Sequence, residues 1–211
     1  MKDKIVVAVL GNRKSGKSRT WNTLFGHTVR TGNRIRRLFL SESEWVDVFL
    51  VSGSPEERHT YVGDIIGKQS PSIVLCSMQY RVDVVETIDY FLQHGYAIYA
   101  QWLNPGYSDA TMQADSLGPL PYLLNRAAVV SIRDGQVDPE PRVYELRDFI
   151  YGWARSRSLI QTSNGPLQPL DPNEDDSLID ELLESNPRFQ TLAAKSKAGP
   201  RMPFHATGVD R

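Results

Sequence analysis

Apolar runs rich in β-branched residues alternate along the chain with segments whose apolar residues recur at helical spacing. The strand-like runs cover residues 5–10, 35–40, 45–51, 72–78, 96–103 and 127–132. Helical spacing is present in residues 21–25, 84–92, 122–126 and 141–157. Continuous apolar runs of this kind are typical of buried strands, and apolar residues at helical spacing are typical of amphipathic helices. The alternation predicts an α/β layer fold around a mostly parallel sheet of six strands.

Two of these strands are expected to be antiparallel. The runs 35–40 and 45–51 are separated only by the polar segment SESE, which suits a hairpin turn and is too short for a helical crossover. Gly26 and Gly95 follow helical segments and are expected to end them. The polar, glycine-punctuated segment 54–70 predicts one or two helical turns at most.

The composition changes after about Ser158, where Pro, Asn, Ser and charged residues dominate. Such a composition is typical of a disordered tail. We therefore predict a folded domain over residues 1–157 and a largely disordered polar tail over 158–211. Within the tail, DDSLIDELLESN predicts a short acidic amphipathic helix near 175–185.

Charge and cysteine content narrow the possible partners and compartment. The 24 Lys and Arg nearly balance the 25 Asp and Glu, for a net charge of -1, so no global field favours a nucleic acid or a membrane surface. The single cysteine, Cys76, allows no internal disulfide and suits a reducing compartment. The first apolar run is too short to span a membrane and has no cleavage site after it. The simplest interpretation is a soluble cytoplasmic protein whose partner is neither a membrane nor a nucleic acid.

The stretch between the first strand and the first helix matches the phosphate-binding pattern G-x-x-x-x-G-K-[ST], known as Walker A. The residues expected to contact a nucleotide are Gly11, Asn12, Arg13, Lys14, Ser15, Gly16, Lys17, Ser18 and Arg19. Glycines let backbone N–H groups turn toward phosphate oxygens, and the helix N-terminus adds partial positive charge. The pattern predicts that Lys17 binds the outer phosphates of a nucleoside triphosphate and that Ser18 ligates Mg²⁺.

The continuation GKSRTWNTLFG is similar to the G-K-S-x-x-x-N-x-L-x-G sequence of small and translation-factor-like GTPases. The chain thus resembles the P-loop NTPase superfamily, and its GTPase-like branch in particular. The resemblance implies a three-layer P-loop NTPase fold whose six-stranded sheet has one antiparallel hairpin strand. It also implies Mg²⁺-dependent binding of ATP or GTP, with switch segments over residues 28–34 and 54–67 that change with nucleotide state.

Two later motifs of that family are altered. Where D-x-x-G is expected, the chain has FLVSGSPEER, with Val51 or Ser52 in place of the aspartate. Where N-K-x-D is expected after residues 96–103, the chain has NPGYSD, which lacks the lysine and places its acid, Asp109, two residues late. In the family the aspartate of N-K-x-D accepts a hydrogen bond from guanine. ATP is therefore slightly preferred over GTP.

Because these motifs are altered, the sequence does not decide which residues other than Lys17 would take part in catalysis. Glu57 or its neighbour Glu56 is the candidate to orient a nucleophile or hold a metal-bound water, and Arg58 or His59 could stabilise transition-state charge. Hydrolysis would then be slow, or activated by a protein that binds the switch segments or the tail. One alternative is a nucleotide or small-molecule kinase, because FLVSGSPEER also resembles the F-L-L-D-G-[FY]-P-R segment of nucleotide kinases. Another is an interaction module that binds nucleotide with little turnover.

Overall fold

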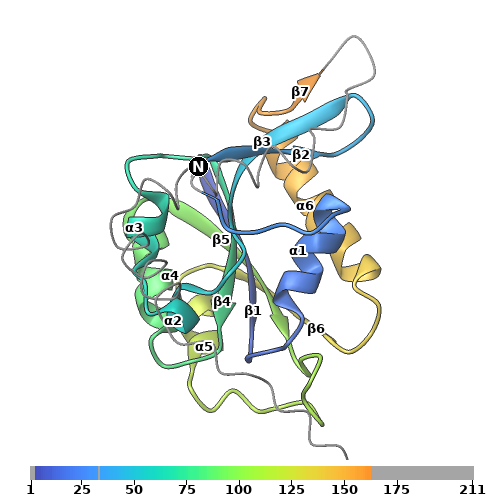
Figure 1. The fold of residues 1–211 in the computed structure, drawn as a ribbon. Coiled ribbons are helices and arrows are strands. Elements are labelled where there is room, and N and C mark those ends of the chain that lie inside the picture. The colour runs from blue at the N-terminus through green and yellow to red at the C-terminus, as the bar shows by residue number, and fades with distance from the viewer. Residues whose placement is uncertain (1–2, 33, 163–211) are drawn as a thin grey trace, which may run out of the picture. The chain divides into compact units, whose positions relative to one another are not determined.

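A seven-stranded sheet forms the centre of residues 3–32 and 34–162, the part of the chain that the computed structural model describes (Figure 1). Its strands are β1 (Lys4–Gly11), β2 (Ile35–Phe39), β3 (Glu44–Val51), β4 (Ile73–Gln79), β5 (Tyr96–Leu103), β6 (Val129–Arg133) and β7 (Gln161–Thr162). The order across the sheet is β2-β3-β4-β1-β5-β6, and β7 pairs with β3 outside this path. The pairs among β3, β4, β1, β5 and β6 are parallel, whereas β2 and β7 run antiparallel to β3.

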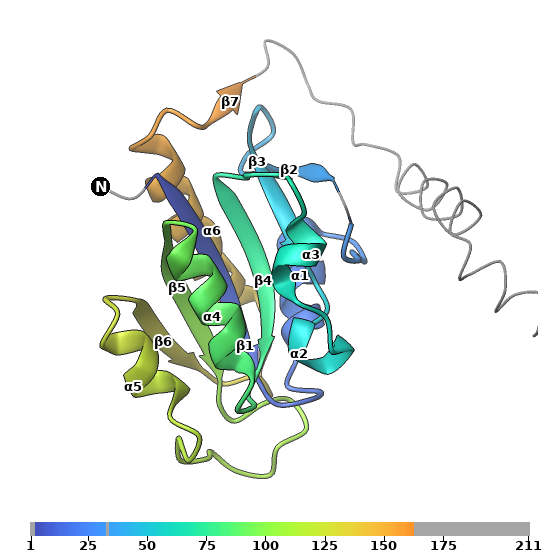
Figure 2. The ribbon, with the colours of Figure 1, turned by 90° about the vertical axis from the view of Figure 1, so that its left-hand side faces the viewer.

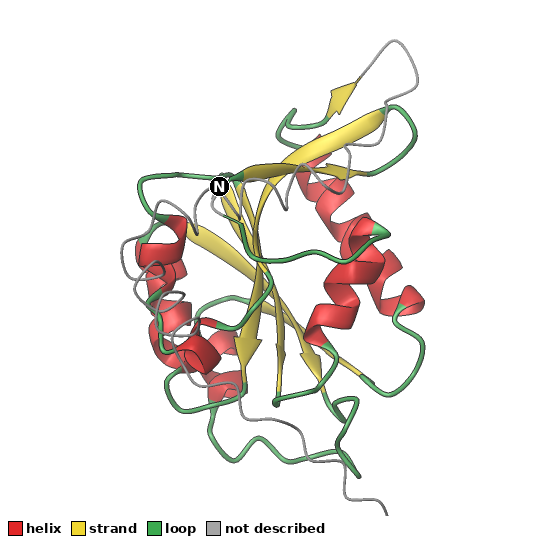
Figure 3. Cartoon of the chain, viewed as in Figure 1, coloured by secondary structure: helices red, strands yellow, loops and turns green. Residues whose placement is uncertain are grey.

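Helices cover both faces of the sheet and complete a three-layer α/β arrangement (Figures 2 and 3). One face carries α1 (Lys17–Phe25) and α6 (Glu140–Arg155), and the other carries α2 (Pro55–Arg58), α3 (Val62–Ile66), α4 (Val84–Gln93) and α5 (Pro119–Leu124). Alternate residues of β1 belong to two buried clusters, with Val6 and Ala8 on the α4 side and Val7 and Val9 on the α1 side. This division follows from the alternation of side chains along a strand.

The local signals for helix and hairpin ends act as predicted. Gly26 caps α1 in the left-handed conformation, with φ of 76°, and its N–H donates to the carbonyl of Thr23. A residue with a Cβ would be strained there. The chain between residues 35 and 51 forms the antiparallel pair β2 and β3. The segment after β3 contains only the short helices α2 and α3.

The α/β class and the mostly parallel sheet are confirmed, but the strand count is not. The sheet has seven strands rather than six, because Gln161 and Thr162 pair with β3 as a second antiparallel neighbour. Leu159 and Ile160, just before this strand, pack against the cluster on the α1 side. The domain boundary predicted at residue 157 thus precedes further contacts with the sheet, and the helix predicted near 175–185 lies outside the described residues.

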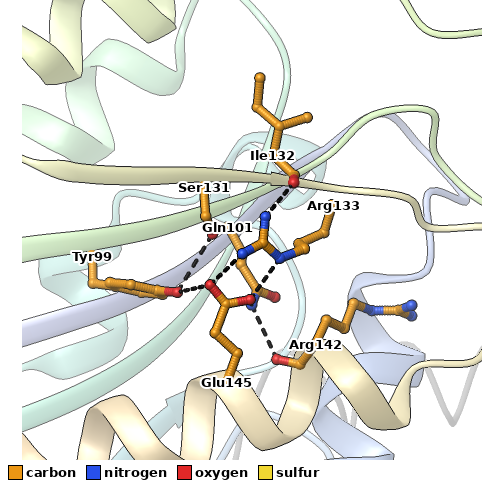
Figure 4. A network of polar contacts seen from close by, with 7 residues as sticks. All are labelled: Tyr99, Gln101, Ser131, Ile132, Arg133, Arg142 and Glu145. Atoms are coloured by element: carbon orange, nitrogen blue, oxygen red, sulfur yellow. Dashed lines mark hydrogen bonds and ion pairs between the residues drawn. The ribbon is translucent and has the colours of Figure 1, made fainter.

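A polar network fixes α6 against β5 and β6 (Figure 4). Both carboxylate oxygens of Glu145 accept hydrogen bonds from the Arg133 guanidinium, at 2.6 Å each. The Tyr99 hydroxyl and the Gln101 amide donate to the same carboxylate at 2.9 and 3.1 Å. The bidentate pair holds the pKa of Arg133 above its ordinary value. In the described part of the chain, no helix combines the length and apolar character needed to cross a membrane.

Candidate functional site

The loop of residues 11–16, called here the glycine loop, connects the carboxyl end of β1 to the first turn of α1 (Figure 1). Because β1 lies between β4 and β5, the loops that follow these two strands border the glycine loop. In open α/β sheets, ligands bind outside the carboxyl ends of the strands. The glycine loop is therefore at the sheet edge where a binding site is expected.

The backbone of the glycine loop alternates in hand. Lys14 and Gly16 have φ of 60° and 101°, whereas Ser15 between them is not left-handed. Such alternation turns successive N–H groups toward one concave side, where an anion can bind. A left-handed non-glycine residue is strained, and strain of this kind concentrates at functional sites. Gly11 has no room for a side chain, because a Cβ there would lie 2.5 Å from the Ser15 hydroxyl oxygen.

The first turn of α1 has free hydrogen-bonding capacity next to this concave side. Its N-cap, Gly16, offers no side chain, and the turn contains no acidic residue. The first N–H groups of a helix lack intrahelical acceptors and carry partial positive charge. Ser18 and Arg19 are exposed on the same turn. An anionic ligand would find unpaired donors and a hydroxyl group here.

Lys17 is buried, with 7% of its surface exposed. Its ammonium group donates to the carbonyl oxygens of Gly11 and Asn12, at 3.0 and 2.7 Å. Burial lowers the pKa of Lys17 to about 8, against the opposing charges of Glu57, Glu56 and Asp109. The ammonium is thus partly desolvated, and no carboxylate of the described residues is bonded to it. A phosphate oxygen would supply the missing negative charge.

Two neighbouring loops hold the glycine loop in place through Ser15. The Ser15 carbonyl accepts a hydrogen bond from the Tyr107 N–H at 2.9 Å, and the Gly135 N–H donates to the Pro105 carbonyl at 2.7 Å. A Cβ on Gly106 would lie 2.6 Å from the Ser15 Cβ, and one on Gly135 would lie 2.5 Å from the Ser15 carbonyl oxygen. These approaches are possible only because both residues are glycines.

The NPGYSD segment, which stands where N-K-x-D is expected, also contacts the glycine loop through side chains. The Asn12 amide donates to Asp109 Oδ2 at 3.2 Å and to Gln113 Oε1 at 3.0 Å. The Gly106 N–H donates to the same Asp109 oxygen at 2.9 Å. On the other side, the Arg19 guanidinium lies 5.5 Å from the centre of the exposed Tyr107 ring. Asp109 therefore anchors this segment to the glycine loop.

The two candidate acids occupy different environments. Glu57 is exposed and lies 3.4 Å from Arg13 Nε in the glycine loop, so the structure brings these two predicted site residues together. Glu56 is buried, and its carboxylate accepts from the Gln79 N–H at 2.9 Å and from the Thr87 hydroxyl at 2.5 Å. Burial raises its pKa, which the two hydrogen bonds oppose. Glu56 thus joins α2 to β4 and α4, and both of its oxygens are occupied.

The two candidate cationic residues lie on and just after α2. The Arg58 guanidinium packs on the Gly53 backbone so closely that a Cβ on Gly53 would overlap with it. Gly53 is the glycine of the altered D-x-x-G motif. His59 is exposed in the left-handed conformation at the end of α2. Arg58 thus covers the backbone after β3.

Within the described ranges, no group of three or more His, Cys, Asp or Glu side chains is arranged to hold a metal ion. A Mg²⁺ ion bound together with phosphates needs only one or two protein ligands, since phosphate oxygens and water complete its shell. The exposed Ser18 hydroxyl on the uncapped first turn of α1 fits this requirement.

Two buried polar residues of the site were not predicted from the sequence. Gln79 ends β4 beside Gly11, and its Oε1 atom has no hydrogen-bond partner among residues 3–32 and 34–162. Arg142 of α6 is 3% exposed and donates from Nε to the Thr20 hydroxyl in α1 at 3.0 Å. Its NH2 group lies 3.7 Å from where a Cβ on Gly16 would be. Gln79 has a weak signal in the sequence, as a polar residue that closes an apolar run, whereas Arg142 has none.

No family model, curated protein or solved structure matches this chain. What the site can do therefore follows from its own geometry. It combines a loop whose backbone alternates in hand, a helix N-terminus without a side-chain cap and a buried ammonium group. These groups are complementary to a chain of phosphates.

Proposed function

We propose that this chain binds a nucleoside triphosphate, ATP or GTP, together with Mg²⁺, in a domain of the P-loop NTPase type. The observation that carries the proposal is the buried Lys17 ammonium, which is bonded only to carbonyls of the glycine loop at the uncapped start of α1. Lys17 would bind the outer phosphates. Apart from the Ser15 N–H, which donates to the Asn12 carbonyl, backbone N–H groups of residues 13–19 would bind the remaining phosphate oxygens.

Ser18 is the proposed protein ligand of Mg²⁺, which would neutralise phosphate charge when bound. Arg13 and Lys14 are exposed at the rim of the glycine loop and would raise the local positive potential. The altered guanine-reading motif leaves ATP slightly preferred over GTP. Asp109, whose Oδ2 atom already accepts from Asn12 and the Gly106 N–H, is not free to recognise a base through that oxygen.

The proposed activity is slow or partner-activated hydrolysis that drives a conformational switch. The first proposed switch segment is bonded to the two residues that precede the second, because the Thr31 hydroxyl accepts from the Gly53 N–H at 3.1 Å and contacts the Ser52 hydroxyl at 3.2 Å. Glu57, beside Arg13, is the acid placed to approach a water near the phosphates. A protein partner that binds the switch segments would supply the remaining charge.

A binding module with little turnover is the second candidate. It is favoured by the state of Glu56, which is buried and whose two carboxylate oxygens each accept an internal hydrogen bond. A kinase-like phosphotransferase has less support. Nucleotide kinases need a lid with paired arginines, and the chain after Asp109 has no arginine before Arg126, which lies over the Tyr122 ring at 3.4 Å from the ring centre.

Isothermal titration calorimetry of the full chain with ATP and with GTP, each with Mg²⁺, tests the binding proposal. Lys17→Ala should weaken binding by roughly tenfold or more, since a charge-assisted hydrogen bond to phosphate is lost. Lys68→Ala, at an exposed lysine, is the matched control and should bind as the wild type does. Absence of binding by the wild type at millimolar nucleotide would refute the proposal.

Single-turnover hydrolysis separates the two candidates. Turnover above the uncatalysed rate that is lost in Lys17→Ala supports the hydrolase. Bound triphosphate that stays intact over the same period supports the binding module.

A further inference from the structure

Gln79 lies immediately beside the glycine loop. It is the last residue of β4 and pairs with Gly11 across the sheet. The Gly11 carbonyl accepts from two donors, the N–H of Tyr80 at 3.0 Å and the Lys17 ammonium at 3.0 Å. Gln79 and Lys17 are therefore neighbours at the carboxyl edge of the sheet.

The Gln79 side chain belongs to the face of the sheet that α1 covers. Side chains two residues apart on a strand share a face, so Gln79 shares one with Ser77. The Ser77 hydroxyl accepts a hydrogen bond from the indole N–H of Trp21 in α1, at 2.8 Å. Gln79 is one step nearer the carboxyl edge, where the first turn of α1 holds Lys17 and Ser18.

The Gln79 side chain is buried, and among the described residues it is the main chain of Gln79 that makes the hydrogen bonds. The residue is 9% exposed, and its Oε1 atom has no partner among the described residues. Its backbone N–H donates to Glu56 Oε2 at 2.9 Å. Buried polar atoms nearly always find a hydrogen-bond partner in the protein, in water or in a ligand. The Oε1 atom beside Lys17 is thus an acceptor that a donor brought by a ligand can use.

We propose that Gln79 Oε1 accepts a hydrogen bond from water bound to the Mg²⁺ of the triphosphate complex. This inference rests on the proposed nucleotide binding. Phosphate oxygens are acceptors and cannot pair with Oε1, whereas metal-bound water is a strong donor. Gln79 would then be a binding residue for the metal–nucleotide complex, and Ser18 would be the direct ligand. It would also provide an oxygen near the ion, since β3 ends in Val51 and β4 ends in Gln79 itself, so that neither strand ends in an acid.

The test measures how much Mg²⁺ strengthens triphosphate binding to the full chain. Calorimetry gives the Kd of ATP, or of GTP if it binds more tightly, in excess Mg²⁺ and in EDTA, and the ratio of the two is compared between variants. Gln79→Leu should lower the Mg²⁺ enhancement roughly tenfold, by loss of a hydrogen bond to a charged group, and leave the Kd in EDTA unchanged. Gln79→Glu keeps the size of the side chain and should raise the enhancement, because a carboxylate attracts the ion.

Gln101→Leu is the matched control. Gln101 is a fully buried glutamine of β5 whose Oε1 also lacks a partner, but its amide donates to Arg142 and Glu145 rather than reaching the strand end. This variant should keep the wild-type Mg²⁺ enhancement. If Gln79→Leu keeps the wild-type Mg²⁺ enhancement, the role of Gln79 is overturned while the proposed nucleotide binding stands. The same holds if Gln79→Leu loses affinity equally with and without Mg²⁺.

Absence of triphosphate binding by the wild type would overturn this inference together with the proposed function. If Gln79→Leu does not fold, as judged by its thermal unfolding, Gln79→Glu decides. An enhancement no greater than that of the wild type would then contradict the inference.

Discussion

Replacing Lys17 with methionine is expected to stabilise the ligand-free protein. Lys17 is 7% exposed, and burial lowers its pKa from the ordinary 10.5 to about 8. Near pH 7 the group is still protonated, so the folded state contains a partly desolvated charge. Methionine has a side chain of similar length, without charge, that adapts to irregular surroundings. The substitution therefore removes an unfavourable term from the folded state.

The size of the effect follows from the pKa and from the hydrogen bonds that are lost. The fall from 10.5 to about 8 corresponds to roughly 3 kcal/mol of unfavourable free energy at pH 7. The two hydrogen bonds that the ammonium donates to the Gly11 and Asn12 carbonyls offset part of it. In the variant both carbonyls keep a hydrogen-bond donor, since the N–H groups of Tyr80 and Ser15 donate to the Gly11 and Asn12 carbonyls at 3.0 and 3.2 Å. We expect a net gain of about 1–2 kcal/mol in the free energy of unfolding.

The pH dependence distinguishes this cause from better packing. Stability rises with pH wherever the unfolded state binds more protons than the folded state. Between pH of about 8 and 10.5 the unfolded chain retains the Lys17 proton and the folded chain has lost it. The wild type therefore gains stability from Lys17 over this window, and Lys17→Met does not. The advantage of the variant should be largest near pH 7 and should shrink as the pH rises.

Urea unfolding near pH 7 and near pH 9.5 measures both effects. Lys68→Met, at an exposed lysine, is the control and should match the wild type within about 0.5 kcal/mol at both values. The reasoning is refuted if Lys17→Met is no more stable than the wild type near pH 7. It is also refuted if the stabilities of the two proteins change in parallel with pH.

Three further outcomes are expected. Triphosphate affinity should fall about tenfold from pH 7 to pH 9, because Lys17 loses its proton near pH 8; calorimetry that finds a flat profile contradicts this. Glu56→Gln should lower the free energy of unfolding by about 1–2 kcal/mol, since an amide has one acceptor oxygen for two donors. The exposed Glu57→Gln should change it by less than about 0.5 kcal/mol, and equal urea midpoints for the two variants would argue against the bridge. Glu145→Gln should cost a similar 1–2 kcal/mol by weakening the bidentate pair with Arg133, and an unchanged midpoint would contradict it.

The parts of the fold that were predictable carry a periodic signal of their own. β1, β4 and β5 are largely apolar runs that are buried on both faces, and α4 has an apolar stripe. β7 has no such signal, because a strand of two residues shows no period. Its pairing with β3 depends on α6 returning the chain to that edge of the sheet. Strand propensity does not predict this pairing, because the pairing depends on the tertiary arrangement.

The candidate site divides in the same way between local and non-local features. The glycine loop is contiguous, so residues 11–19 could be identified from spacing alone. Gln79 and Arg142 reach the site only through the strand order and the position of α6. The largely apolar strand β4 ends in the amide of Gln79 rather than in an acid. A glutamine that acts through its amide oxygen belongs to no motif of the sequence, so the sequence alone does not identify it as a site residue.

The strand order also determines how the loop after β3 can respond to a ligand. β4 lies between β1 and β3, so this loop does not follow a strand that borders the glycine loop. It reaches the site through α2 instead, where Glu57 approaches Arg13 and Glu56 holds the Gln79 N–H and the Thr87 hydroxyl. One carboxylate joins the end of β4 to both α2 and α4, so a shift of the end of β4 would act on both helices. The proposed switch thus has a physical connection to the phosphates even though the aspartate of D-x-x-G is missing.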